Sequence, residues 1–337
     1  MTMKVDGALI GRDWTRSGEE AALLEAQGFA GAWSFEGQHD PFIPLVLAAE
    51  RTESIELGTA IAVAFARNPM ITAYSALDVQ TLSKGRFILG LGTQIRPHIE
   101  KRFSQPWSKP VERMREFVMA LRAIWTAWTE RTRLDFRGEF YTHTLMTPMF
   151  VPPMPFGSPP IYLAGVGPRM VEMVGEVADG FFVHPFHSAA FLEAETLPAL
   201  RRGLAKAGRD RATFAISCQT IVAVGSNDAE IETARQKARG QISFYGSTPA
   251  YKGVLEHHGH PALQPELNRL SKQGKWGEMM GLIDDALFDE LAVSGTPAEV
   301  ARRLRERNDF ADRTTLMLYN EAQPEAVVDV VRELAAG

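Results

Sequence analysis

Apolar, β-branched segments alternate along the chain with segments whose apolar residues recur at helical spacing. Strands of continuous apolar character that alternate with helices indicate a parallel sheet covered by helices on both faces. About eight such units fit into the 337 residues, which favours a (β/α)8 TIM barrel over a doubly wound open sheet. The expected strands lie in the sequences MKVDGALI, FAGAWSF, SIELGTAIAVA, GRFILGLG, PPIYLAGV, DGFFVHPF, TFAISCQTIVAVG and TTLMLYN.

Two segments interrupt this alternation. Residues 132–159 are rich in proline and turn-forming residues, and residues 248–290 have the pattern of several helices. Long excursions from a barrel commonly shape the mouth of the active site or an oligomer contact. We therefore expect residues 1–337 to form one barrel domain that carries these two excursions.

Charge is spread over the whole chain, with a formal net charge of -5 and no long block of one sign. This pattern argues against a nucleic-acid partner and against a polybasic membrane-binding patch. No apolar run is long enough to cross a bilayer, and the first residues become polar too early for a secretory signal. Cys218 is the only cysteine, which excludes an internal disulfide and fits a reducing compartment. We expect a cytoplasmic protein that acts on a small-molecule substrate.

The sequence GLGTQI, which begins at Gly90, contains two of the three glycines of a dinucleotide-binding fingerprint. Ile95 stands where the third glycine is required, so this interpretation is weak. If GRFILGLG is a barrel strand, Gly90 and Gly92 lie near its carboxyl end. There they either leave space for a flat ligand or make room for neighbouring side chains.

A better anion site follows the strand IYLA. The glycine turn, which consists of Gly165, Val166, Gly167 and Pro168, leads into a segment with one apolar helical face. Proline is tolerated at the first helical position, and the unpaired N–H groups and positive dipole of a helix N-terminus favour a phosphate. Arg169 is adjacent. The alternative is a simple connection between a strand and a helix.

Polar side chains follow several predicted strands. Glu36, His39 and Asp40 follow the second strand, and His184 ends another. At the carboxyl ends of barrel strands such groups can act as general acids. The alternative is structural, because carboxylates cap turns and histidines bond to backbone groups. Arg96 lies after the GLGTQI segment, either near an anionic cofactor tail or in a solvated loop.

Two further features are expected to carry no chemistry. The histidines of the sequence HHGH (His257, His258 and His260) lie in a predicted polar loop without partners at metal-ligand spacing. No metal site is expected there. Cys218 lies inside an apolar strand, where a free cysteine commonly packs as a small apolar side chain.

Five sequences together resemble the luciferase-like monooxygenase superfamily. In chain order they are GFAGAWSFEGQHDPF, IELGTAIAVAFARNPM, LSKGRFILGLGTQIRPHIEKRF, RMREFVMALRAIW and PPIYLAGVGPRMVEMVGEVADG. Within the superfamily the chain is most similar to the coenzyme F420-dependent oxidoreductases. The resemblance implies a (β/α)8 barrel, a homodimer, and FMN or the deazaflavin F420 at the carboxyl ends of the strands.

The resemblance also implies cofactor contacts by position. Ala60 and Ile61 match the place of a non-proline cis peptide behind the ring. The glycine turn matches the phosphate-binding turn, in agreement with the anion site proposed above. Gly92, Thr93 and Gln94 match the segment beside the ring and its side chain. Candidates for contact with the anionic tail are the arginines Arg67, Arg96 and Arg169.

One position departs from the pattern of the F420-dependent relatives. Many of them carry a histidine after the acid that ends the second strand, whereas Gly37 follows Glu36 here. His39 and Asp40 can substitute as proton donors.

The expected function is that of an oxidoreductase that transfers a hydride between F420 and a small organic substrate, with the coenzyme carrying the hydride. Two alternatives stay open. One is an FMN-dependent luciferase-like monooxygenase. The other is a flavin-binding protein without catalytic activity, which the missing histidine would explain.

Overall fold

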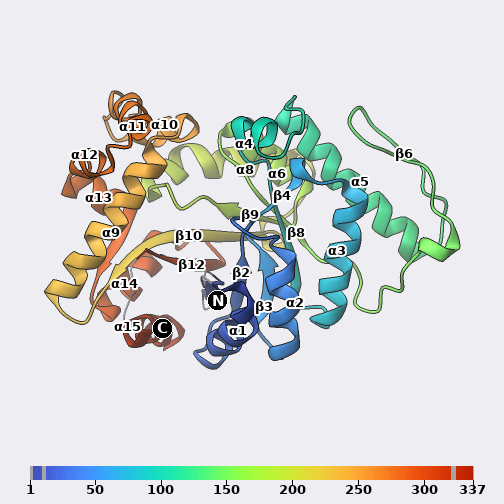
Figure 1. Ribbon diagram of the computed structural model, residues 1–337, viewed down its shortest axis with the longest axis horizontal. Coiled ribbons are helices and arrows are strands. Elements are labelled where there is room, and N and C mark those ends of the chain that lie inside the picture. The colour runs from blue at the N-terminus through green and yellow to red at the C-terminus, as the bar shows by residue number, and fades with distance from the viewer. Residues whose placement is uncertain (1–2, 10–12, 320–323, 337) are drawn as a thin grey trace.

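Parallel strands close into a ring, which confirms the TIM barrel and excludes the open sheet. The computed structural model describes residues 3–9, 13–319 and 324–336. Within these residues eight strands pair side by side, and the last pairs with the first (Figure 1). In order around the ring they are β1 (Lys4–Ala8), β2 (Gly31–Ser34), β3 (Glu56–Thr59), β5 (Phe87–Gly92), β8 (Ile161–Ala164), β9 (Gly180–Val183), β10 (Ala215–Val224) and β12 (Arg313–Leu318).

Two short strands extend this ring. β4 (Ala62–Val63) follows β3 and pairs with the end of β5. β11 (Ala292–Gly295) pairs with residues 221–224 of β10, beyond the part of β10 that pairs with β9. β10 and β12 therefore extend past the ring on one side of the barrel mouth. The sequence pattern did not predict β11, because its four residues directly follow a helical segment and have no alternation of their own.

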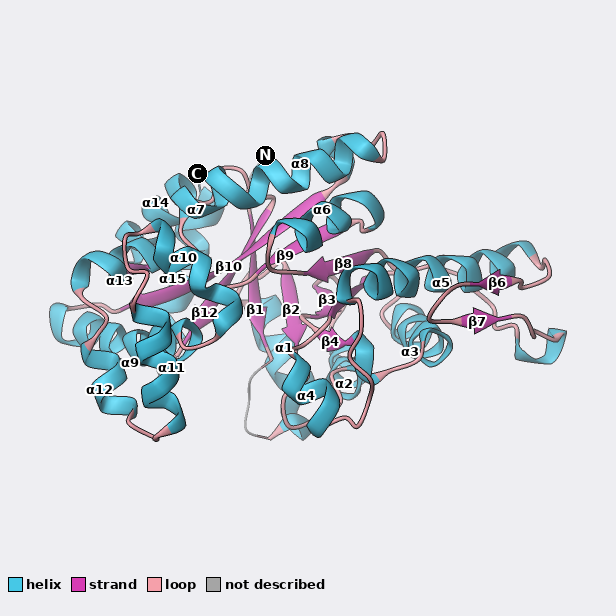
Figure 2. Cartoon of the chain, turned by 90° about the horizontal axis from the view of Figure 1, so that it is seen from above, coloured by secondary structure: helices cyan, strands magenta, loops and turns pink. Residues whose placement is uncertain are grey.

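Helices cover the outside of the ring (Figure 2). In α5 (Pro110–Glu130) the apolar residues recur at helical spacing and form its buried face, where Met114, Phe117 and Leu121 are fully buried. None of the described helices combines the length and the apolar character needed to cross a membrane. The main helices around the barrel are α1 (Ser17–Ala26), α2 (Phe42–Arg51), α3 (Pro69–Leu82), α5 (Pro110–Glu130), α6 (Pro168–Val177), α8 (Leu197–Lys206), α9 (Asp228–Gly246), α14 (Pro297–Arg307) and α15 (Pro324–Ala336).

Large side chains fill the middle of the ring. This interior layer consists of residues from four strands, Trp33, Ile88, Tyr162 and Phe182. Gly90 lies two positions beyond Ile88 on β5, opposite Tyr162, and a Cβ atom there would be 1.8 Å from the carbonyl oxygen of Thr59. Gly90 therefore makes room for the neighbouring strand, which is one of the two interpretations that the sequence left open.

A buried ion pair joins the first and the last strand of the ring. Arg313 on β12 donates through Nε and Nη2 to both carboxylate oxygens of Asp6 on β1, at 2.8 and 2.6 Å. Its Nη1 donates to Oε2 of Glu56 on β3, at 2.6 Å. The side chains of Arg313 and Asp6 are 3% and 0% exposed. Although burial lowers it, the pKa of Arg313 is raised by the two carboxylates, so the guanidinium stays charged.

Residues 132–159 form an arm that extends away from the barrel beyond α5 (Figures 1 and 2). It contains the antiparallel strands β6 (Phe136–Arg137) and β7 (Thr142–His143). The connection between β6 and β7 is bound to α5, because the Glu116 carboxylate accepts hydrogen bonds from the backbone N–H groups of Glu139, Phe140 and Tyr141. The turn-rich composition predicted an excursion here but not this strand pair.

Residues 248–290 form a helical insertion next to the extended ends of β10 and β12. Its helices pack with α9 around a second apolar core, to which Ile221 and Ala223 of β10 contribute. The insertion therefore lies over the β10 side of the mouth (Figure 1). Its helices are α10 (Lys252–His257), α11 (Leu263–Lys272), α12 (Trp276–Gly281) and α13 (Asp285–Leu291).

The ion pair inside the barrel predicts a large stability effect. Arg313→Met leaves the buried Asp6 without its cation, whereas Glu56 keeps its ion pair with Lys4, and we expect the free energy of unfolding in urea to fall by about 3–5 kcal/mol. Arg332→Met is the matched control, because Arg332 forms an exposed ion pair with Asp329, and such pairs contribute about 0–1 kcal/mol. Similar losses in the two variants would contradict this account of the pair.

Candidate functional site

The barrel mouth lies at the carboxyl ends of the strands, one step above the interior layer. Side chains two positions apart on a strand point to the same face, so the residues that face the mouth follow from the interior layer. They are Ala164 at the end of β8, and Phe35 and His184 directly after β2 and β9. Phe35 is 50% exposed, and the other two are half-buried. The mouth is therefore open above the interior layer.

One wall of the mouth contains the cis peptide bond that the resemblance implied between Ala60 and Ile61. The N–H group of Ala60 donates to the Ser34 carbonyl at 2.7 Å, and the Ile61 carbonyl accepts from the N–H group of Glu36 at 3.1 Å. Gly92 packs against this segment, since a Cβ atom on Gly92 would be 2.9 Å from Cδ1 of Ile61. The structure therefore brings these predicted cofactor contacts together.

Thr93 and Gln94 continue from β5 along the same wall and are half-buried. Gln94 has a left-handed backbone with φ 60°, and its Oε1 accepts from the N–H group of Ile95 at 2.8 Å. The segment that follows is the helix α4 (Arg96–Lys101), where the sequence left a loop open. Arg96 is exposed on it and pairs with Glu100 at 2.9 Å. Thr93 and Gln94 thus border the mouth, whereas Arg96 forms an ion pair at the surface.

Glu36 and Asp40 both bind Arg67, next to the end of β2. Nη1 of Arg67 donates to Oε2 of Glu36 at 2.5 Å, and Nη2 donates to Oδ2 of Asp40 at 2.6 Å. The same Glu36 oxygen accepts from the N–H group of Val63 at 2.7 Å. Although burial lowers it, the pKa of Arg67 is raised by the two carboxylates. In this structure the Glu36 carboxylate ties Arg67 and β4 to the end of β2.

His39 and Gly37 lie in the loop after β2. His39 is exposed, and its ring centroid is 5.8 Å from that of Trp14. The Gly37 carbonyl accepts from Nη2 of Arg102 at 2.6 Å. A Cβ atom on Gly37 would be 2.8 Å from the ring of Phe35. Phe35 therefore occupies the space beside the position where many relatives carry histidine.

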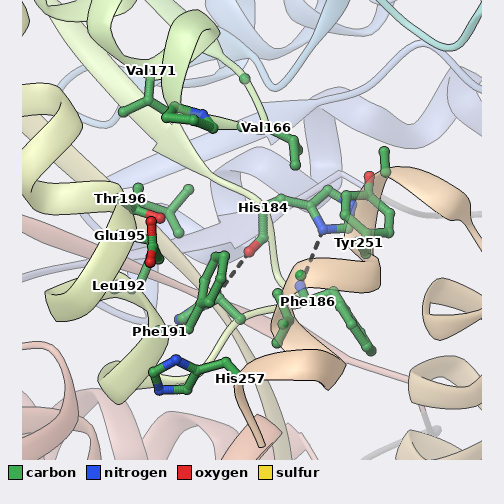
Figure 3. Close-up of a pocket in the computed structure, with 18 of the residues that line it drawn as sticks. Val166, Val171, His184, Phe186, Phe191, Leu192, Glu195, Thr196, Tyr251 and His257 are labelled. Carbon is green, nitrogen blue, oxygen red and sulfur yellow. Dashed lines mark hydrogen bonds between the residues drawn. The ribbon is translucent and has the colours of Figure 1, made fainter. Parts of the chain in front are cut away.

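A cavity of about 430 Å³ begins at the glycine turn (Figure 3). The turn forms its wall at the N-terminus of α6, where Gly167 is the N-cap residue with φ 85°. A Cβ atom on Gly167 would meet nothing within 4 Å. Within the described residues no side chain caps this helix, so its first N–H groups are free to bind a ligand. Arg169 is exposed and pairs with Glu112 at 2.7 Å.

The rest of the cavity wall comes from β9, the segment after it and the helical insertion. The segment η4 (Leu192–Thr196) is one turn of π-helix, and α10 lies across the cavity from it. Carboxylates are present on these walls but not in the glycine turn. The side chains named in Figure 3 on this part of the wall are His184, Phe186, Phe191, Leu192, Glu195, Thr196, Tyr251 and His257.

His184 connects the cavity with the barrel mouth. Its ring stacks on Tyr251 at a centroid distance of 4.2 Å and meets the edge of Tyr245 at 4.9 Å. Its Nδ1 accepts from the N–H group of Phe186 at 3.1 Å, so the proton of the neutral ring lies on Nε2. Burial lowers the pKa of His184 to about 3. His184 is therefore a neutral hydrogen-bond donor at pH 7, which differs from the role of a general acid.

His187 and Cys218 form a buried pair behind His184. Nδ1 of His187 donates to the His184 carbonyl at 2.8 Å, which leaves Nε2 to accept from the Cys218 thiol at 3.3 Å. Burial raises the pKa of Cys218 to about 12. The thiol is thus protonated and serves the packing of the site.

Comparison with known proteins identifies the family. Residues 3–314 match the family described as luciferase-like monooxygenase. The chain belongs to this family. It is 55% identical over 326 residues to an uncharacterized protein of Mycobacterium tuberculosis, and the match covers 96% of each chain.

Two further matches concern reductases. The chain is 31% identical over 294 residues to the 5,10-methylenetetrahydromethanopterin reductase of Archaeoglobus fulgidus, which covers 84% of this chain and 83% of the reductase. The coenzyme F420-dependent tetrahydromethanopterin reductase of Methanopyrus kandleri has the same fold, with a TM-score of 0.80 at 19% identity over 99% of this chain and 98% of that one. Oxidoreductases and monooxygenases thus share the luciferase-like barrel.

The sequence did not single out two tyrosines that contact His184 and a third that contacts one of these two. Tyr245 belongs to α9, Tyr251 to η6 (Pro249–Tyr251), and Tyr319 follows β12. No motif marks the first two, because their position depends on how the helical insertion packs. Tyr319 had a usable signal, since it ends a predicted strand just as His184 does.

We expect the titration of His184 and His187 to differ between the folded and the unfolded protein. Because burial lowers both pKa values to about 3, His184 and His187 should stay neutral in imidazole NMR spectra of the folded protein between about pH 5 and 8. In urea-unfolded protein they should titrate near about 6.5.

The sign of the linked stability change follows from these values. The unfolded chain binds protons first, so the two histidines reduce stability as the pH falls from about 6.5 towards 3. His184→Gln and His187→Gln assign the two signals. A signal of either residue that titrates near pH 6.5 in the folded protein (about the ordinary value) would refute the assignment of neutral donors.

Proposed function

We propose that the protein is an F420-dependent oxidoreductase that transfers a hydride between the deazaflavin and a small organic substrate. The observation that carries this proposal is the cavity, because it runs from the N-terminus of α6 to His184 at the barrel mouth. The carboxyl ends of barrel strands are where ligands of such folds bind. The identity to the Archaeoglobus reductase and the fold shared with the F420-dependent Methanopyrus reductase support this choice of coenzyme.

The glycine turn fits the phosphate of the coenzyme. α6 has ten residues, so its N-terminus carries the partial positive charge of a helix dipole. The backbone N–H groups of Arg169 and Met170 lie in its first turn, and Gly167 has no side chain to block them. The carboxylates of Glu195 and Glu256 belong to other parts of the cavity wall. The nearby carboxylate of Glu112 is paired with Arg169. An anion at the turn therefore finds backbone donors, and the turn itself contains no carboxylate.

The wall formed by Ala60, Ile61 and Gly92 fits a planar ring, because two of its three residues have small side chains or none. When bound, the deazaflavin supplies or accepts the hydride. Glu36 and Asp40 both bind Arg67, so they hold its guanidinium at the mouth, the end of the barrel that also carries this wall. We keep the exposed His39 as the candidate that exchanges a proton with solvent.

A second candidate function is that of an FMN-dependent monooxygenase. It is favoured by Gly37, because the loop after β2 lacks the histidine of many F420-dependent relatives. Both coenzymes combine a phosphate with a flat tricyclic ring, so the glycine turn and the mouth fit either of them. A flavin-binding protein without activity is the third outcome that an experiment has to separate.

Coenzyme titrations separate these functions. We expect the purified protein to bind F420 with a dissociation constant of about micromolar size and FMN at least about tenfold more weakly, both followed by coenzyme fluorescence. Tighter binding of FMN than of F420 would replace the first candidate by the second. Binding of F420 without hydride transfer to any of a panel of alcohols, ketones and enones would leave the third.

A carboxylate placed at the glycine turn tests the phosphate site. Gly167→Asp should weaken the binding of the coenzyme by about tenfold or more through charge repulsion at short range. Gly208→Asp is the matched control, because Gly208 also has a left-handed backbone with open space around it but does not line the cavity. Equal coenzyme affinities of the two variants would contradict the assignment of the phosphate to the glycine turn.

A further inference from the structure

Four aromatic rings meet at the insertion side of the barrel mouth. This aromatic cluster consists of His184, Tyr245, Tyr251 and Tyr319, from β9, α9, η6 and the end of β12. His184 contacts Tyr251 and Tyr245 at centroid distances of 4.2 and 4.9 Å. Tyr245 contacts Tyr319 at 6.5 Å. The cluster thus joins strands of the barrel to the helical insertion, and His184 and Tyr251 also line the cavity (Figure 3).

His184 offers one hydrogen-bond donor from this cluster. Since its Nδ1 accepts from the backbone of Phe186, the proton is on Nε2. Within the described residues no acceptor binds this Nε2–H group. His184 is only partly buried and lines the cavity, so this N–H group can donate to a ligand atom that lies there.

The two tyrosine hydroxyls offer a second donor. The hydroxyl oxygens of Tyr245 and Tyr319 are 3.0 Å apart, and either can be the donor. Whichever donates, the hydrogen of the other hydroxyl is left over, because each hydroxyl has one hydrogen and two lone pairs.

The cluster carries no formal charge. Burial lowers the pKa of His184 to about 3 and raises the pKa values of Tyr245, Tyr251 and Tyr319. All four groups are therefore neutral at pH 7. An ion bound there would lose hydration without gaining an opposite charge. A neutral hydrogen-bond acceptor loses less hydration free energy than an ion and gains two hydrogen-bond donors. The cluster therefore favours uncharged ligands.

We propose that the Nε2–H group of His184 and the free hydroxyl of the Tyr245–Tyr319 pair bind the carbonyl oxygen of an uncharged cyclic or aromatic substrate. A carbonyl oxygen has two lone pairs, which matches two donors on contacting side chains. The rings of the cluster supply an apolar surface for the rest of the molecule. This inference deepens the proposed function and rests on it, because a carbonyl carbon is a hydride acceptor.

Ligand-observed NMR tests this with the protein alone. The probes are acetophenone, ethylbenzene, which has a similar shape without the carbonyl, and benzoate, which is charged. We expect the protein to bind acetophenone about tenfold or more tightly than either other probe. Equal binding of acetophenone and ethylbenzene, or tighter binding of benzoate, would overturn the proposal.

Variants then assign the preference to the named donors. In the double variant Tyr245→Phe/Tyr319→Phe, and in His184→Phe, the ratio of the affinity for acetophenone to the affinity for ethylbenzene should fall towards one. Tyr74→Phe is the control, because the Tyr74 hydroxyl donates to the Phe150 carbonyl in the arm; it should keep the ratio of the unmodified protein. A preference that survives in the double variant would overturn the assignment to the tyrosines.

Two further measurements keep the outcomes apart. Circular dichroism shows whether a variant folds, and if it does not, the comparison of the three probes on the unmodified protein still decides. F420 titration of the same samples addresses the proposed function separately. Failure of the unmodified protein to bind F420 would remove the F420-dependent function, whereas failure to prefer acetophenone would remove only the carbonyl site.

Discussion

The ion pair between Asp6 and Arg313 holds the first and the last strand of the barrel together. The two residues are 307 positions apart in the chain, and they meet in the interior, where an unpaired charge would be strongly unfavourable. A shift of either strand by one residue would turn one partner outwards. The pair therefore favours a single register for ring closure, and with it a single arrangement of the strand ends.

The arrangement of the strand ends then decides what the mouth contains. Above the interior layer, one side of the mouth carries Ala60 and Gly92, with little side-chain volume. The other side carries His184 and the tyrosines, over which the helical insertion packs. This division gives the site a surface for a flat ring and, across from it, a set of neutral hydrogen-bond donors. The cavity leads from there to the helix N-terminus at the glycine turn.

Local features of this site could be predicted from the sequence, and long-range ones could not. The glycine turn, the strand ends at Gly92 and His184, and the buried face of α5 all follow from patterns within a few residues. The two carboxylates that bind Arg67 and the pair of Tyr245 with Tyr319 depend on how distant segments pack. Arg169 pairs with Glu112 of α5, and Arg96 pairs with Glu100 on its own helix. Both are therefore ion-paired at the surface, although the sequence suggested contact with a cofactor tail.

The central claim is that the glycine turn holds the phosphate of a planar redox coenzyme whose ring lies in the barrel mouth. A crystal structure of the complex with F420 tests it most directly. We expect density for the phosphate within hydrogen-bond distance of the backbone N–H groups of Arg169 and Met170, and for the ring beside Ala60. Density for the phosphate at any other place, with the glycine turn facing only solvent, would contradict the claim.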